Sequence, residues 1–359
     1  MVGAGVVGLA HALAGLRRGL KVVVLDSEAQ CIGASVRNFG FVAVTGQKAG
    51  QTWARARRSR NIWVEVAAKA GITVEQQGLL VAAQRPEAVA VLEAFLATEM
   101  GADCRMVRPK DYPLRVMAGA MWSPHERRAE SREAIPKLAA WLEAQGVRFL
   151  RPVLVRGVAA GMVETTTGPV MAQRIVVCPG DDLQTLFADQ IAGLGITRCR
   201  LQMVRVQPQA GFRLPGAVMS DLSLVRYGGY ACLPEAAALK ARLEAEMGAE
   251  LAAGIHLIAV QGADGRLVVG DSHHYEDSPS PFASGHVDAM IFKELQRILP
   301  LEGAEVVERW QGTYANLPDK AMVRLAPDAA IRLVIVTSGT GASTGFAIGE
   351  ETVDEMFRE

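Results

Sequence analysis

Three glycines at the start of the chain constrain its fold more than any other feature. Gly3, Gly5 and Gly8 lie in the segment MVGAGVVGLAHAL and match the spacing G-x-G-x-x-G. This spacing is typical of a turn between a strand and a helix whose N-terminus binds the diphosphate of a dinucleotide. Only two residues precede Gly3, so the strand expected before the turn is almost absent. The motif predicts a dinucleotide-binding α/β domain.

A second strand, after the predicted helix, indicates which dinucleotide is bound. The segment KVVVLD ends on Asp26, eighteen residues after Gly8. An acidic residue at this distance is suited to bind a ribose 2′-hydroxyl group. Ser27 and Glu28 follow it, whereas a 2′-phosphate would favour basic residues there. The sequence therefore favours a dinucleotide without a 2′-phosphate.

The composition excludes several classes of partner. Basic and acidic residues number 38 each, so the formal net charge is zero, and 50% of the 359 residues are hydrophobic. The length and the apolar content predict a globular protein of about two domains. The balanced charge predicts that it binds neither nucleic acid nor an acidic membrane surface. We interpret the basic segment RARRSR, residues 55–60, as the exposed face of a helix.

The cysteines and the apolar N-terminus bear on the cellular compartment. The five cysteines show no C-x-x-C spacing, which indicates free thiols in a reducing compartment. Arg17 and Arg18 follow the apolar start, whereas a secretory signal carries its charge before it. No apolar run reaches the ~18 residues of a membrane span. We therefore expect a cytoplasmic protein.

The pattern of apolar residues predicts alternating strands and helices, followed by longer strands. Strands are expected near Leu79 and over 147–155, 173–180, 200–208 and 225–234, with a hairpin over 256–273 that turns at Asp264 and Gly265. Helices are expected over 86–100, 133–146, 234–248 and 286–299, and a strand, glycine turn and helix over 332–357.

These elements predict an α/β fold with a Rossmann-like dinucleotide-binding domain and an inserted, mainly antiparallel α+β domain. The first domain is expected to comprise residues 1–75, 125–199 and 316–359. The second, which would bind the substrate, is expected to comprise 76–124 and 200–315. Such an interleaved arrangement favours a ligand site between the domains.

Three segments resemble one family over the whole length of the chain. They are IGASVRNFG (32–40), VVCPGDD (176–182) and GTGASTGFAIG (339–349). Each is similar to the corresponding segment of FAD-dependent oxidoreductases of the D-amino-acid oxidase/glycine oxidase/sarcosine oxidase superfamily. The resemblance implies that the first segment follows the FAD diphosphate and the flavin ring. The last would place a helix N-terminus against the pyrimidine end of the flavin, where its positive end stabilises negative charge.

The resemblance and the glycine motif together imply a set of FAD-binding residues. Arg37 would supply a forked cation, Asn38 amide donors, and Gly40 a close backbone approach. The full set is Gly3, Gly5, Val6, Val7, Gly8, Asp26, Ser27, Ala34, Ser35, Arg37, Asn38, Phe39, Gly40, Val153, Cys178, Pro179, Gly180, Gly339, Thr340, Gly341, Ser343, Thr344, Gly345 and Phe346. We expect the FAD to be dissociable, because no cysteine follows Cys232 and His11 lies inside the first predicted helix.

The resemblance also implies a reaction, the oxidation of an amine to an imine that water then hydrolyses. In amino-acid-oxidising relatives an arginine after a W-x-G-x motif binds the substrate carboxylate, but here Tyr314 stands at that position. Val268 occupies the place of the oxygen-activating lysine of sarcosine oxidase relatives. Both departures favour a substrate with another anionic group.

The segments SVRNFG, WSPHE, VVCPGDD, VRYGGY and GDSHH are most similar to a subgroup associated with bacterial aminophosphonate breakdown. A phosphonate requires several donors, and the candidates are Arg226, Tyr227, His273, His274, Tyr314 and Lys48. Each has a structural alternative: an exposed strand position for Arg226, interdomain packing for Tyr314, and solvent exposure for one of the two histidines.

Several functions remain open at this point. The first is oxidation of a small anionic amine such as a 2-aminoethylphosphonate derivative, with oxygen or another electron acceptor. The second is a conventional glycine, sarcosine or D-amino-acid oxidase. A nicotinamide-dependent dehydrogenase and a non-catalytic FAD scaffold are alternatives of other classes. The oligomeric state is not predicted.

Two other chemistries are disfavoured. Residues 341–345 form a literal G-x-S-x-G, but the hydrolase that uses it needs a later acid and histidine, and no histidine follows. A metal site is not predicted, because no H-E-x-x-H occurs and His273 and His274 would point to opposite faces of a strand.

Overall fold

Val2 joins two groups of strands into one sheet. The computed structural model describes residues 1–115 and 118–358. In it, Val2 forms parallel bridges with both Leu25 and Val177. The strands so connected are β1 (Val23–Leu25), β6 (Arg148–Leu150), β10 (Ile175–Val177), β18 (Ile331–Val336) and β17 (Met322–Asp328). All neighbours are parallel except β17 and β18. Residues 1–3 thus occupy the strand position before the glycine turn, between β1 and β10.

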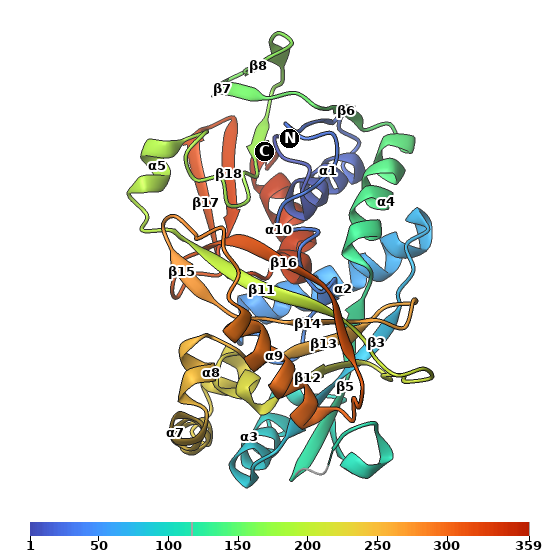
Figure 1. The fold of residues 1–359 in the computed structure, drawn as a ribbon. Coiled ribbons are helices and arrows are strands. Elements are labelled where there is room, and N and C mark those ends of the chain that lie inside the picture. The colour runs from blue at the N-terminus through green and yellow to red at the C-terminus, as the bar shows by residue number, and fades with distance from the viewer. Residues whose placement is uncertain (116–117, 359) are drawn as a thin grey trace.

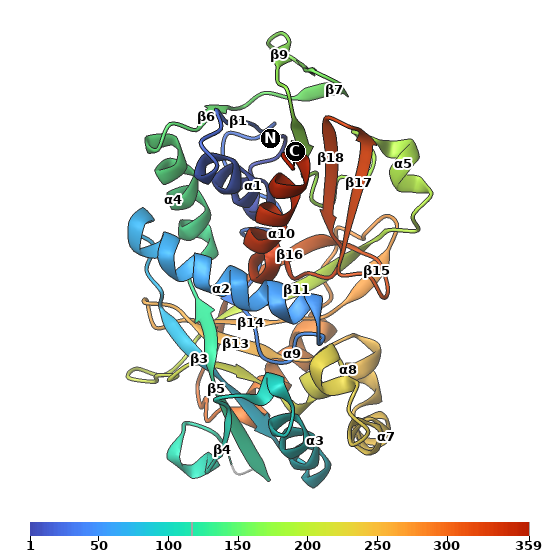
Figure 2. The ribbon, with the colours of Figure 1, turned by 180° about the vertical axis from the view of Figure 1, so that it is seen from behind.

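Four helices pack around this parallel sheet (Figures 1 and 2). They are α1 (Val6–Arg17), α2 (Gln51–Ala70), α4 (Ser131–Ala144) and α10 (Gly341–Met356). The prediction that residues 55–60 form an exposed face is wrong in part. Arg55 is buried and binds Glu351 of α10 with two nitrogens, and Arg58 binds Glu350. These arginines therefore connect α2 to α10 rather than only facing solvent.

A small three-stranded sheet extends from the top of this domain in the view of Figure 1. Its strands are β7 (Val155–Ala159), β8 (Met162–Thr165) and β9 (Val170–Met171). A short helix, α5 (Ala188–Ala192), follows β10.

The second layer is a ten-stranded, mainly antiparallel sheet in the lower half of Figure 1. Its strands are β2 (Phe41–Val42), β3 (Gln76–Ala83), β4 (Arg105–Val107), β5 (Gly119–Arg128), β11 (Thr197–Gln207), β12 (Ala217–Met219), β13 (Ile258–Gln261), β14 (Leu267–Gly270), β15 (His274–Glu276) and β16 (Glu305–Asn316). Three predicted domain boundaries fall inside its strands, one each in β5, β11 and β16. The predicted hairpin over 256–273 is present as β13 and β14.

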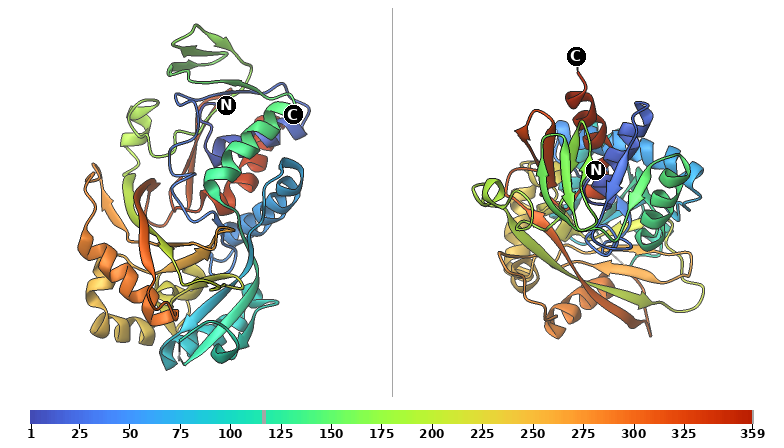
Figure 3. Two further views of the ribbon diagram at one scale, coloured as in Figure 1. Left: turned by 45° about the vertical axis from the view of Figure 1, so that its right-hand side comes forward. Right: turned by 90° about the horizontal axis from the view of Figure 1, so that it is seen from above.

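Helices cover the outer side of this sheet (Figure 3, left). They are α3 (Pro86–Leu96), η1 (Glu99–Gly101), η2 (Pro109–Asp111), α7 (Ala236–Glu246), α8 (Gly248–Ala252) and α9 (Gly285–Ile298). Their apolar faces and the sheet enclose a large core that includes Phe95, Leu239 and Leu295. Together the two layers have the α/β architecture expected from the sequence. No helix of the described residues is long and apolar enough to cross a membrane.

The predicted strand over 225–234 is wrong. The chain there forms the 3-10 helix η3 (Asp221–Val225) and the short helix α6 (Gly228–Ala231), with Arg226 and Tyr227 between them. Two adjacent glycines weaken a strand, and Tyr230 is fully buried against the ring of Phe95, 4.6 Å between centroids. Burial of this aromatic ring favours the compact turn over an extended strand.

A buried carboxyl group in α9 leads to a stability prediction. Glu294 is 1% exposed, and neither of its carboxyl oxygens accepts a hydrogen bond within the described residues. Burial, together with the charge of Asp221, raises the pKa of Glu294 to about 7. Between the unfolded pKa and about pH 7, the folded protein keeps this proton while the unfolded chain loses it. The contribution of Glu294 to the free energy of unfolding therefore falls as the pH rises through this range, and it is constant above it.

Glu294→Gln is expected to raise the free energy of unfolding by roughly 2 kcal/mol at pH 8, because each unit of raised pKa corresponds to about 1.4 kcal/mol. At pH 4 the substitution should change the free energy of unfolding little. Urea denaturation at the two pH values measures this difference. Glu244→Gln, at an exposed position, is the control, and an equal gain for Glu294→Gln at both pH values would contradict the argument.

Candidate functional site

The N-termini of α1 and α10 lie side by side. A side chain built on Gly341 would be 3.6 Å from the side chain of Val6. Neither helix has an acidic residue in its first turn, and neither N-cap residue, Gly5 or Thr340, caps its helix with a side chain. Each helix N-terminus carries a partial positive charge on its free N–H groups. Two positive helix ends therefore converge on one place, which suits an anionic ligand.

The close packing at the start of α1 explains its glycine spacing. A Cβ atom on Gly8 would lie 1.9 Å from the carbonyl oxygen of Gly3. Only glycine lets the helix approach the turn this closely. The turn also contacts Asp26 at the end of β1, whose carboxylate accepts hydrogen bonds from the N–H groups of Ala4 (2.6 Å) and Glu28 (2.9 Å). Asp26 is half-buried and retains free lone pairs for a ribose hydroxyl group.

The segment 34–40 closes over the N-terminus of α1. Ser35 accepts a hydrogen bond from the N–H of Val6 at 2.9 Å, so its own hydroxyl hydrogen remains available to a ligand. Asn38 donates to the carbonyl of Ala34 (2.7 Å) and accepts from the N–H of Gly40 (2.7 Å). Its amide therefore shapes the loop, and one of its two donors is already used.

The structure places Arg37 on the other side of this loop. Its side chain is exposed and lines a cleft of about 680 Å³, together with Trp310, Gln311 and Arg132. The backbone carbonyl of Arg37 accepts a hydrogen bond from the indole of Trp310 at 3.2 Å. Ser35, Asn38 and Gly40 instead line a small cavity with Val6 and Ala342. Arg37 thus faces the second domain rather than the helix ends.

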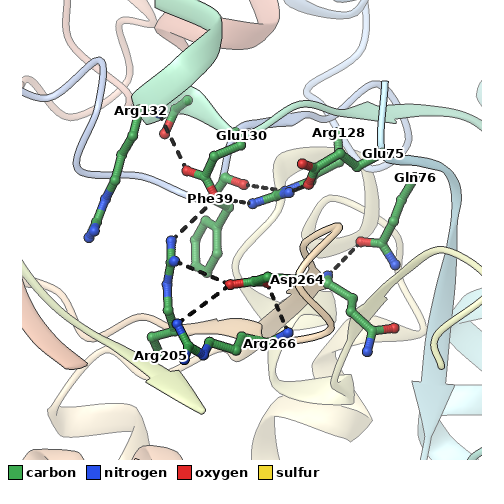
Figure 4. Close-up of polar contacts among 12 residues, drawn as sticks. Phe39, Glu75, Gln76, Arg128, Glu130, Arg132, Arg205, Asp264 and Arg266 are labelled. Atoms are coloured by element: carbon green, nitrogen blue, oxygen red, sulfur yellow. Dashed lines mark hydrogen bonds and ion pairs between the residues drawn. The ribbon is translucent and has the colours of Figure 1, made fainter. Parts of the chain in front are cut away.

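A buried charge network holds the end of the loop (Figure 4). Arg128, 1% exposed, donates to the carbonyl of Phe39 at 3.2 Å and to Glu130 at 2.8 Å, and it also binds Glu75. Glu130 accepts from Arg205 of β11 in turn. Figure 4 shows these side chains converging from β5, β11 and the start of α4 behind Phe39. Because Phe39 is itself buried, this network fixes the loop from its rear.

The remaining predicted cofactor residues differ in their surroundings. Val153 donates its N–H to the carbonyl of Asp26 at 2.8 Å, and Cys178 donates to Val2 at 2.8 Å, so both lie beside the glycine turn. Ser27, Gly180 and Gly339 are exposed, and Val7, Ala34, Pro179, Thr340 and Gly341 are half-buried. Gly345 packs on Val7.

Three predicted cofactor residues at the start of α10 have occupied side chains. Ser343 accepts from the N–H of Ala43, and Thr344 donates to the carbonyl of Thr340, both at 2.9 Å. The ring of Phe346 packs edge-on against Trp63, 5.0 Å between centroids. These three side chains make contacts inside the domain. The backbone N–H groups of the first turn of α10 are therefore the groups that could contact a ligand there.

Several predicted substrate residues do meet, at the α10 end of the large sheet. The guanidinium of Arg226 donates to the hydroxyl of Tyr275 at 2.9 Å. The ring of Tyr314 contacts Gly339, the residue before the N-cap of α10. Burial raises the pKa of Tyr314 well above its usual value, and the same is true of Tyr227. Both hydroxyl groups therefore stay protonated and can act as donors.

His273 and His274 point in different directions, as alternation along a strand requires. His273 is buried, its Nδ1 lies 2.9 Å from the carbonyl of Gly254, and its Nε2 faces Asp271 at 3.6 Å. Burial lowers the pKa of His273 to about 3, so its ring is neutral. His274 is half-buried on β15, opposite Arg200 of β11. Neither histidine is arranged as a direct donor to an anion beside Arg226.

Lys48 lies near this group but at the surface. It is exposed, and a side chain on Gly228 would be 3.1 Å from its Cβ atom. The loop before α2 therefore runs beside α6, two residues from Arg226.

Three residues of this region were not predicted from the sequence. Tyr275 follows His273 at an i, i+2 spacing, a signal for a shared strand face that could have been used. His256 and Asp271 carry no such signal, because they precede β13 and follow β14 and meet only when the hairpin forms.

The residues around the two helix ends fit FAD. The free N–H groups of α1 and the Ser35 hydroxyl suit a diphosphate, and Asp26 suits a ribose. The end of α10 lies between this place and Tyr314, where a flavin ring would follow. Parts of the three expected cofactor segments, Gly3–Gly8, Arg37–Gly40 and Gly339–Gly345, lie together at the helix ends, whereas the side chain of Arg37 does not.

Comparisons with known proteins agree with this geometry. Glycine oxidase from Geobacillus kaustophilus has a similar structure, with a TM-score of 0.78 and 17% identity over 100% of this chain and 94% of that one. L-proline dehydrogenase from P. horikoshii gives a TM-score of 0.78 and 19% identity over 99% and 92%. Iminodiacetate oxidase from Chelativorans sp. BNC1 gives a TM-score of 0.71 and 18% identity, over 98% of this chain and 93% of that one.

Comparison of the amino-acid sequence with family models identifies the family of this protein. No curated protein sequence matches the chain significantly. The model of the family described as "FAD dependent oxidoreductase" matches residues 1–355, nearly the whole chain. The protein therefore belongs to the DAO family of FAD-dependent oxidoreductases.

Proposed function

We propose that this protein oxidises a small amine that carries an anionic group, and that a 2-aminoethylphosphonate derivative is its substrate. The observation that carries the proposal is the grouping of Arg226, Tyr275 and Tyr314 beside the N-terminus of α10. One cation and two hydroxyl donors lie where the flavin end of the cofactor would face the second domain. The products would be a carbonyl compound and ammonia or methylamine.

Dissociable FAD is part of the proposal. Bound FAD would supply the acceptor for the hydride that leaves the carbon next to the substrate nitrogen. Asp26, Ser35 and the N–H groups of α1 would hold its ADP part, and the N-terminus of α10 would face its ring. The protein residues around the amine have three tasks: to bind, to orient and to exclude water.

The site favours the uncharged amine that hydride loss requires. An alkylammonium group titrates near the lysine value of about 10.4 in water, and each unit by which its pKa falls costs about 1.4 kcal/mol. The positive charge of Arg226 disfavours a second cation nearby. This charge would lower the pKa of the substrate amine, so a strongly basic side chain is not needed.

The choice of anion rests on the donors present. A phosphonate offers three oxygens, and charge-assisted hydrogen bonds to each are short and strong. Arg226 and the hydroxyls of Tyr275 and Tyr314 supply donors from three segments of chain. The arginine that resembling amino-acid oxidases use for a carboxylate is replaced here by Tyr314. These features support a tetrahedral anion over a planar carboxylate.

Anaerobic reduction of the bound flavin tests the proposal. The holoenzyme is mixed with 2-aminoethylphosphonate, its N-methyl derivative, glycine, sarcosine, D-alanine and ethylamine, and loss of flavin absorbance is followed. We expect the aminophosphonates to bleach the flavin fastest. Reduction by the amino acids alone would establish the glycine, sarcosine or D-amino-acid oxidase alternative.

The remaining outcomes separate the other classes. A flavin that stays oxidised with every amine would indicate a non-catalytic FAD scaffold. A colourless protein that releases no flavin on denaturation would indicate a nicotinamide-dependent enzyme.

A further inference from the structure

Two histidines and one aspartate converge beside the grouping described above. Nε2 of His256 lies 3.0 Å from Oδ1 of Asp271, and Nε2 of His273 lies 3.6 Å from Oδ2. The three ligand atoms lie within 4.8 Å of one another, and all three residues are buried. They meet because β13 and β14 are paired, so the segment before β13 and the segment after β14 share one end of the hairpin.

The outer nitrogen of each imidazole faces a hydrogen-bond acceptor. Nδ1 of His273 lies 2.9 Å from the carbonyl oxygen of Gly254, so this nitrogen must carry the hydrogen. Nδ1 of His256 lies 3.5 Å from Oγ of Ser223, whose own hydrogen is donated to the carbonyl of His256. In His273 the hydrogen therefore sits on Nδ1, and the lone pair of Nε2 faces Asp271. The contact with Ser223 favours the same position of the hydrogen in His256.

The Nε2 atoms of the two histidines and the carboxylate of Asp271 are thus hydrogen-bond acceptors that face one another. Oδ1 of Asp271 accepts no hydrogen bond from any described residue, although the side chain is more than nine-tenths buried. A buried carboxylate oxygen without a partner is unfavourable. The group that satisfies two imidazole lone pairs and a carboxylate at one point is a cation.

We propose that His256, Asp271 and His273 bind a divalent transition-metal ion of the zinc class. Imidazole nitrogen and carboxylate oxygen are ligands of such ions, and a metal-bound histidine characteristically donates its other N–H to a carbonyl or similar acceptor, as His273 does. This inference does not depend on the amine substrate. It revises the expectation from sequence that the chain has no metal site.

The composition of the site predicts an open position. Three protein ligands leave a fourth place for water or an anion. One carboxylate leaves a divalent ion with a net positive charge, and Arg226, the neighbouring cation, adds to it. An anion is therefore the expected fourth ligand, and inorganic phosphate should strengthen metal binding.

Zinc content of the holoenzyme tests the proposal. Protein without an affinity tag is dialysed against micromolar Zn²⁺ and then against metal-free buffer, and zinc and FAD are measured per chain. We expect about one zinc per chain for the wild type. Asp271→Asn and His256→Gln should each lower zinc affinity at least ~10-fold while FAD content is retained.

His274→Gln is the matched control, because His274 adjoins the cluster in sequence but lies outside it. A second readout is thermal unfolding: a chelator should lower the Tm of the wild type but not that of Asp271→Asn. If the variants do not fold, the wild-type zinc content and chelator effect decide the question alone. Less than about 0.1 zinc per chain in the wild type, or equal loss in His274→Gln, would overturn the proposal.

Discussion

Gly40→Ala is expected to weaken FAD binding by at least ~100-fold, which corresponds to about 2.7 kcal/mol. Gly40 has φ +68°, and a Cβ atom there would lie 1.7 Å from the carbonyl oxygen of Ala129. The left-handed backbone alone costs an alanine roughly 1–2 kcal/mol, and the clash forces the loop away from Ala129. Since the N–H of Gly40 also binds Asn38, the loop over the α1 N-terminus loses its shape.

The measurement is the ratio of flavin to protein after gel filtration, with the FAD Kd from fluorescence titration of the apoprotein. Gly33→Ala is the matched control, because Gly33 lies in the same segment, has no positive φ, and would place its Cβ atom in open space. Equal FAD retention in both variants would show that loop 34–40 does not contribute to cofactor binding.

The second large effect is expected at Arg226, if the proposed substrate class is right. Arg226→Met should lower kcat/KM for an anionic amine by ~100- to 1,000-fold, roughly 3–4 kcal/mol, because a charge-assisted partner of the anion is removed. Most of the change should appear in KM, since the anion is bound equally before and during hydride transfer.

Steady-state kinetics with an anionic amine and with ethylamine separate binding from general damage. Turnover of ethylamine, which has no anion, should change less than ~10-fold in Arg226→Met. Arg213→Met, at another exposed position, controls for loss of positive charge. Parallel losses for the two amines would show that Arg226 supports the fold of the site rather than binding the anion.

The segments of the proposed cofactor site could be identified in the sequence because their signals are local. Gly3 and Gly8 constrain one turn, Asp26 ends one strand, and Gly341 begins one helix. Each acts through backbone geometry within a few residues, so spacing alone identifies it. Arg37 and Phe346 show the limit of this reasoning, since spacing identifies a segment but does not determine which way each side chain points.

The structure around the proposed substrate residues was harder to predict, because it depends on contacts between distant segments. Arg226 was placed on a strand, but burial of Tyr230 against Phe95 favours a compact turn there. Val2 pairs with both Leu25 and Val177, residues that lie far from one another in the sequence, and no local propensity indicates this. In both cases long-range packing overrides the local preference.

The sequence by itself determined the class of fold, the dinucleotide turn and the family, because strand and helix periods and glycine spacings are properties of contiguous residues. Only the tertiary structure decided that Arg226 meets Tyr275, and that His256 and Asp271 meet His273. These residues come from segments far apart in the chain. Their meeting depends on strand pairing and burial, energies that arise only once the chain has folded.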